Sequence, residues 1–139
     1  MSDAIEFTGF VSADDKIERL RRAHVCVCPS MKEGWGLTNI EANACGTTVI
    51  AADVEGLRDS VNDGVSGLLY PYGDLEALAE RLTGVLSDDE ARHKLERGAI
   101  DWARQFNWDD AAEKFMTVIR DTLETSAHPK QKTEQVEQE

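Results

Sequence analysis

The chain has 139 residues, of which 41% are hydrophobic, and its net charge is −12 at pH 7. This length and composition predict one ordinary domain with a single buried core. Such an acidic surface repels phosphate backbones and anionic lipid, which argues against nucleic-acid binding and membrane-surface roles. Because we find neither an apolar run of about 20 residues nor a signal peptide, we expect a cytoplasmic protein without membrane insertion.

Short apolar runs alternate with segments of helical period, which is typical of a parallel sheet covered by helices. The predicted strands are residues 5–8, 24–28, 48–52 and 68–70. The predicted helices are residues 14–22, 37–45, 56–62, 75–86, 88–105 and 109–125. The expected fold class is therefore α/β, with a Rossmann-like parallel sheet of about four strands and helices on both faces.

The end of the chain differs in composition from the rest. Residues 126–139, SAHPKQKTEQVEQE, are polar and show no periodicity, so they are predicted to form a disordered tail. Residues 1–125 remain as the folded part.

The cysteines give no support for a disulfide framework or a metal site. Cys26, Cys28 and Cys45 are odd in number and lie in apolar segments, which predicts reduced core thiols. The sequence also lacks a D-x-D metal motif, and its near match, DVE at 53–55, is interpreted as a loop. We therefore expect no metal.

The stretch EGWGLTNIEA places Glu33 and Glu41 around a pair of glycines at a predicted helix start. It follows the second predicted strand, so the loop before the helix leaves the carboxyl end of a parallel strand, where open α/β sheets bind ligands. Gly34 and Gly36 allow a ligand to approach the backbone, and the helix directs its free N–H groups and positive end at the same place. An anion such as a diphosphate would be stabilised there.

The separation of the two glutamates limits what they can do together. A rise of about 1.5 Å per helical residue puts Glu33 and Glu41 roughly 10 Å or more apart, too far to serve as acid and base at one bond. They are predicted to hold two ends of a long ligand. The simpler alternative is a helix with a tight entry loop and two solvated acids.

This stretch resembles the motif of two glutamates separated by seven residues in the family 4 type glycosyltransferases, which are retaining enzymes of two-domain GT-B architecture. The similarity covers about residues 5–123 and includes FTGFVSADDKIERL, VEGLRDSV and the closing RQFNWDDAAEKF. It implies that residues 1–125 are a partial C-terminal, nucleotide-sugar-binding domain.

The resemblance implies a role for each matching position. Glu33 is expected to be catalytic, contacting hydroxyls of the transferred hexose or lying near the reacting carbon, and Glu41 to bind the ribose hydroxyls. Phe10 and Val11 match a loop that flanks the base. The sugar and diphosphate are expected to lie along Gly34, Trp35, Gly36, Leu37 and Thr38. No cofactor is expected beyond the nucleotide-sugar donor, which in similar proteins is usually a UDP- or GDP-hexose.

Two departures from the family pattern matter. Thr48 stands where the family usually has proline. Family members also carry, before the matching part, an acceptor-binding N-terminal domain and strands with an Arg and a Lys that clamp the diphosphate. We therefore expect this chain to be inactive alone and to need that domain in cis or in trans. Because a missing strand would lie beside residues 24–28, we also expect self-association through an exposed strand edge.

The expected function is the donor-binding part of a retaining hexosyltransferase. One alternative is a stand-alone nucleotide-sugar-binding module or a split-enzyme subunit that needs a partner chain. Another is a GT-B-like nucleotide-sugar epimerase. The spacing of Glu33 and Glu41 favours the transferase, whereas nothing in the sequence specifies the donor base, the donor sugar or the acceptor.

Overall fold

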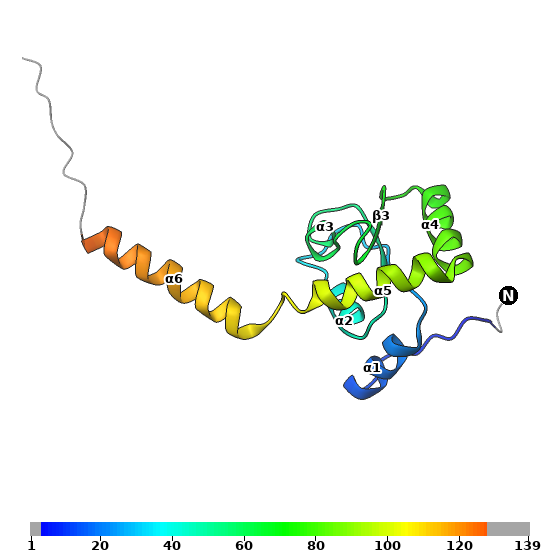
Figure 1. Ribbon diagram of the computed structural model, residues 1–139, viewed down its shortest axis with the longest axis horizontal. Helices are drawn as coiled ribbons and strands as arrows, with labels where there is room; N and C mark the ends of the chain where they lie inside the picture. Colours follow the sequence, from blue (N-terminus) through cyan, green and yellow to red (C-terminus); the bar gives the residue numbers. More distant parts are fainter. Residues whose placement is uncertain (1–3, 128–139) are drawn as a thin grey trace, which may run out of the picture. The chain divides into compact units, whose positions relative to one another are not determined.

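The computed structural model describes residues 4–127, which belong to two compact units divided after Gln105 (Figure 1). The first unit contains the sheet and most of the helices. The second contains one helix, α6 (Trp108–Ala127), whose first turn is capped by Asn107, since its Oδ1 accepts from the N–H of Asp110 at 2.8 Å. Residues 128–139 of the predicted tail lie outside the described residues.

The sheet of the first unit has three parallel strands in the order β1 (Cys26–Cys28), β2 (Val49–Ala52) and β3 (Gly67–Tyr70). Every side chain of β2 is buried. Because successive side chains point to opposite faces of a strand, both faces of this central strand are covered. The predicted α/β class, with a parallel sheet flanked by helices, is confirmed.

Five helices accompany the sheet: α1 (Ala13–Arg22), α2 (Leu37–Ala44), α3 (Leu57–Ser60), α4 (Leu75–Ser87) and α5 (Asp89–Ala103). Side-chain caps start three of them, because Ser12, Asp74 and Asp88 accept hydrogen bonds from backbone N–H groups in the first turns of α1, α4 and α5. Helices α2, α3, α4 and α5 contact the strands, and α1 contacts α2. No helix in the described range 4–127 is long and apolar enough to cross a bilayer.

The predicted first strand, residues 5–8, is not a strand in the structure. A short apolar run that includes Ile5 and Phe7 predicts it, but these two side chains are 62% and 94% exposed. A strand persists only where a neighbour takes up its backbone hydrogen bonds, and the described residues offer this segment none. The prediction of about four strands is therefore corrected to three.

Thr48, the departure from the family proline, is accommodated by its surroundings. Its side chain is fully buried and its hydroxyl donates to the carbonyl oxygen of Ser66 at 3.2 Å. The Asn43 side-chain amide donates to the same carbonyl at 3.2 Å and to that of Thr47 at 3.1 Å. The hydroxyl introduced at position 48 is thus satisfied, which removes the usual cost of burying a polar group.

The edge of β1 supports a test of self-association. Within residues 4–127, β1 pairs with β2 alone, so its other edge has no neighbouring strand. We expect the chain to form dimers or larger species at high concentration, and Val27→Lys to suppress them, because a charge on an edge strand opposes pairing. Size-exclusion chromatography with light scattering measures both. A monomeric wild-type chain at high concentration would contradict this expectation.

Candidate functional site

The glutamate loop, defined as residues 29–36, leaves the carboxyl end of β1 and ends at the start of α2. Its last residue, Gly36, precedes the helix with φ of +70°, a left-handed conformation that glycine adopts without steric cost. The helix then begins at Leu37, as predicted. It stops before Gly46, which has φ of +86° and donates its N–H to the carbonyl of Asn43, so the predicted stop is also confirmed.

The start of α2 is fixed by contacts with α3 and α5. Gly36 is buried, and a Cβ atom there would lie 2.5 Å from Ser60 Oγ and 2.9 Å from a methyl carbon of Leu57. The side-chain amide of Asn39 donates to Ser60 Oγ at 2.9 Å. The indole N–H of Trp102, on α5, donates to the backbone carbonyl of Ser60 at 3.1 Å. Ser60 therefore joins three helices beneath the loop.

At Gly56, the loop that follows β2 packs closely against the glutamate loop. It precedes α3 with φ of +81°, and a Cβ atom on it would overlap the carbonyl oxygen of Glu33 and lie 2.9 Å from its carbonyl carbon. The loops that leave two adjacent parallel strands are thus in contact. Glu33 lies where the carboxyl ends of β1 and β2 meet, although nothing in the sequence paired it with Gly56.

The amino terminus of α2 has no side-chain cap among the described residues, unlike those of α1, α4 and α5. We call it the open amino terminus. It follows a glycine, has no acidic residue in its first turn, and none of the described side chains caps it. Asn39 donates its N–H to the carbonyl of Gly36 at 2.9 Å, which leaves the N–H groups of Leu37 and Thr38 and the positive end of the dipole for an anion. The structure places the predicted ligand-lining residues along this start: Glu33, Gly34, Leu37 and Thr38 are exposed, Trp35 is half-buried and Gly36 is buried.

Glu41 lies further along α2 and has a partner that the sequence did not reveal. Its Oε2 accepts a hydrogen bond from Lys16 Nζ of α1 at 2.5 Å. Phe10 and Val11 lie just before α1, the first fully exposed and the second half-buried. Their expected contact with a base stays a prediction, as do the roles of the two glutamates.

An ion pair follows the end of β2. Arg58 Nε donates to Asp53 Oδ1 at 2.6 Å, and this hydrogen bond raises the pKa of the guanidinium. Asp53 opens the DVE stretch, so its carboxylate is paired with arginine. Among residues 4–127, no group of three or more His, Cys, Asp or Glu side chains is placed to hold a metal ion.

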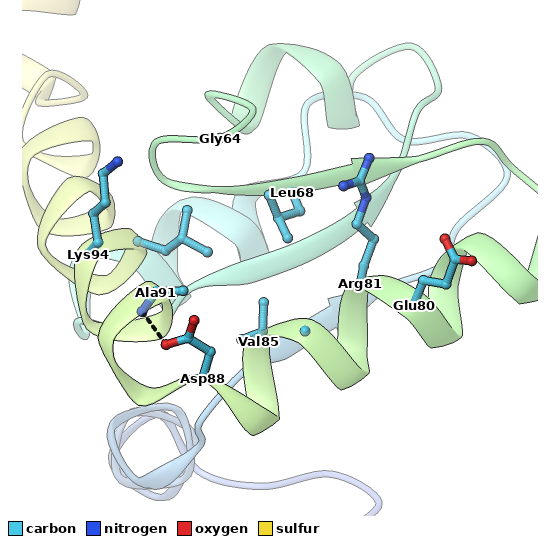
Figure 2. A pocket seen from close by; sticks show the side chains of 10 residues that line it. Gly64, Leu68, Glu80, Arg81, Val85, Asp88, Ala91 and Lys94 are labelled. Atoms are coloured by element: carbon cyan, nitrogen blue, oxygen red, sulfur yellow. Dashed lines mark hydrogen bonds between the residues drawn. The ribbon is translucent and has the colours of Figure 1, made fainter.

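A cavity of about 410 Å³ lies elsewhere in this unit, between α4, α5 and β3 (Figure 2). Leu68 and Val85 contribute apolar lining, and Arg81 and Lys94 contribute positive charge. Figure 2 shows that one lining residue, Asp88, turns to cap the backbone of α5. The cavity is formed partly by the loop preceding β3, whereas the glutamate loop follows β1. None of the predicted site residues lines it.

A family described as glycosyl transferases group 1 matches residues 1–102. The chain belongs to the group 1 glycosyl transferases. The matched part contains the whole sheet, the glutamate loop and nearly all of α5.

Individual relatives are much longer than the chain itself. It is 41% identical over 123 residues to a D-inositol 3-phosphate glycosyltransferase of Acidothermus cellulolyticus, covering 88% of this chain and 27% of that protein. It is 45% identical over 98 residues to a D-inositol 3-phosphate glycosyltransferase of Xylanimonas cellulosilytica, covering 70% and 24%. The chain thus spans about a quarter of the length of these curated relatives.

Solved structures agree with the fold. Sucrose-phosphate synthase from Thermosynechococcus elongatus aligns with a TM-score of 0.79 and 34% identity over 88% of this chain and 31% of that one. The C-terminal domain of a group 1 glycosyl transferase from Francisella tularensis aligns with a TM-score of 0.62 and 30% identity, covering 71% and 51%. These likenesses support the expected assignment to part of a GT-B C-terminal domain.

Proposed function

We propose that this chain is the donor-binding part of a retaining, family 4 type glycosyltransferase that takes a hexosyl group from a UDP- or GDP-hexose. One observation carries the proposal. Glu33 and Glu41 flank the open amino terminus of α2, and the loop before it leaves the carboxyl end of a parallel strand. This arrangement suits an extended ligand with a sugar at one end, a diphosphate in the middle and a nucleoside at the other.

The chemistry assigned to these groups follows from the charges that develop during transfer. Breaking the bond between sugar and phosphate leaves positive charge at the anomeric carbon and negative charge on the diphosphate. The N–H groups at the start of α2 stabilise the departing diphosphate. Glu33 orients the hexose beside the reacting carbon, and Glu41 holds the ribose hydroxyls. Catalysis in this proposal is mostly positioning and electrostatics.

The relatives support a transferase over the epimerase alternative, because they are named D-inositol 3-phosphate glycosyltransferases. In this proposal the acceptor site belongs to an N-terminal domain supplied in cis or in trans, and the Arg and Lys that clamp the diphosphate belong to the first strands of the C-terminal domain. This chain therefore binds the donor but does not complete the transfer alone.

An amide NMR titration tests the donor site. The chain is titrated with UDP, GDP, ADP and their hexose conjugates, and the titration is repeated on Glu41→Ala. We expect shifts centred on residues 33–41 with one base. In the variant we expect binding weaker by about tenfold or more, because hydrogen bonds to a charged acceptor are worth roughly 1.5–3 kcal/mol.

The control is Glu18→Ala, which removes one exposed carboxylate from α1 and so matches the change in charge. It should bind nucleotide as the wild-type chain does. A folded spectrum that shows no shifts at millimolar nucleotide would overturn donor binding by this chain, and so would shifts centred away from the glutamate loop and α2.

A further inference from the structure

The pairing of Lys16 with Glu41 joins two helices at the proposed ribose site. Lys16 Nζ lies 2.5 Å from Glu41 Oε2 although the residues are 25 positions apart. Both side chains are partly exposed, at 42% and 47%, so the pair is accessible to a ligand. Because neither sequence spacing nor helical period links these residues, only the packing of α1 against α2 brings them together.

The backbone around Lys16 is well anchored. Its N–H donates to the carbonyl of Ser12 at 3.0 Å, and the hydroxyl of Ser12 accepts from the N–H of Asp15 at 3.1 Å. At the other end of α1, the carbonyl of Leu20 accepts a hydrogen bond from Thr47 Oγ1 at 2.5 Å. This bond ties the end of α1 to the segment after α2. The lysine therefore extends toward Glu41 from a helix that is capped at its start and tied near its end to the segment after α2.

Lys16 places a positive charge beside the one charged side chain of α2. Glu41 is the only charged residue in the sequence of α2, LTNIEANA, and the chain as a whole carries a net charge of −12. Lys16 supplies the cation beside that carboxylate. Cys26 has a half-buried thiol, and burial raises the pKa of that thiol. The charges of Lys16 and Glu41 also act on this pKa, so the thiol lies close to the pair.

A carboxylate with one oxygen bound to an ammonium group retains acceptor sites on its other oxygen. Its orientation is then set before a ligand arrives, which reduces the entropy lost on binding. We propose that Lys16 is a positioning residue for nucleotide recognition, fixing Glu41 so that it accepts hydrogen bonds from the ribose hydroxyls. This inference rests on the proposed function, in which Glu41 binds ribose.

The inference makes a prediction about ribose discrimination rather than affinity alone. Wild-type chain, Lys16→Met and Lys16→Arg are titrated with UDP and with 2′,3′-dideoxy-UDP, and with the corresponding guanine pair. Methionine is unbranched, one atom shorter than lysine and similar to it in helix propensity, but it carries no charge. We expect Lys16→Met to weaken binding of the ribonucleotide by about fivefold to tenfold and to leave that of the dideoxynucleotide unchanged. Arginine should restore most of the preference.

Two controls separate positioning from a general structural role. Lys94→Met removes an exposed lysine from α5 and should keep the wild-type preference for ribose. In the Glu41→Ala background, Lys16→Met should have no further effect, because the group that it positions is gone. Lys16→Gln serves as a second variant if Lys16→Met does not give a folded spectrum.

The outcomes distinguish the inference from the proposed function. Wild-type preference retained in Lys16→Met overturns the inference, and so does equal weakening of both nucleotides. A wild-type chain that binds neither ribonucleotide overturns the proposed function, and the inference with it. Binding that is lost in Glu41→Ala but unchanged in Lys16→Met overturns the inference alone.

Discussion

Gly56→Ala is expected to destabilise the first unit by about 3 kcal/mol or more. Two costs add at this position. The backbone has φ of +81°, where a side chain is strained, and the new Cβ atom would overlap the carbonyl oxygen of Glu33. The obstructing atoms belong to the backbone, so the glutamate loop itself must move. Urea unfolding followed by circular dichroism measures the loss.

Gly73→Ala is the matched control for Gly56→Ala. Gly73 has φ of +84°, but among the described residues nothing lies within 4 Å of a Cβ atom placed there. This variant therefore has the backbone strain without the overlap. It should lower the free energy of unfolding by about 1 kcal/mol. If both variants lose the same stability, the contact between Gly56 and Glu33 does not restrain the loop. If Gly56→Ala stays folded, displacement of the loop should still weaken nucleotide binding.

The second large effect is expected at Gly98, inside α5. A Cβ atom there would overlap the carbonyl oxygen of Val65 and lie 2.9 Å from its carbonyl carbon, because the helix approaches the loop before β3 closely. Alanine normally stabilises a helix relative to glycine by up to about 1 kcal/mol. Overlap with backbone should outweigh that gain, so we expect Gly98→Ala to destabilise the unit by about 1–3 kcal/mol. The urea midpoint reports the change.

Gly84→Ala, in the neighbouring helix α4, provides the comparison. A Cβ atom at Gly84 meets nothing within 4 Å among the described residues, so only the helix propensity changes. This variant should be more stable than the wild-type chain by about 0.5–1 kcal/mol. The same substitution is thus expected to lower the free energy of unfolding at Gly98 and to raise it at Gly84. A Gly98→Ala variant as stable as Gly84→Ala would contradict the close approach of α5 to Val65.

Much of the fold follows from the sequence because its signals are local. The alternation of apolar runs with helical segments predicts the parallel strands. Glycine before Leu37 and after Cys45 sets the bounds of α2 within short stretches of chain. The motif of Glu33 and Glu41 is equally local, since its position after a strand and before a helix is enough to propose a ligand.

Residues 5–8 show that a local pattern alone does not establish a strand. The short apolar run that includes Ile5 and Phe7 is typical of a strand, yet the segment is irregular in the structure. A strand depends on hydrogen bonds to a neighbour that is distant in sequence, and periodicity alone cannot show whether that neighbour is present.

The supports of the candidate site were decided only by tertiary structure. The contact of Gly56 with Glu33, the hydrogen bond from Asn39 to Ser60 and the pairing of Lys16 with Glu41 each join residues more than 20 positions apart. These contacts arise where loops and helices pack, and packing depends on every element at once rather than on a short pattern. The sequence by itself therefore determined the three parallel strands, the glutamate motif and its place after a strand. The packing of α1, α2 and α3 decided which groups hold that motif in position.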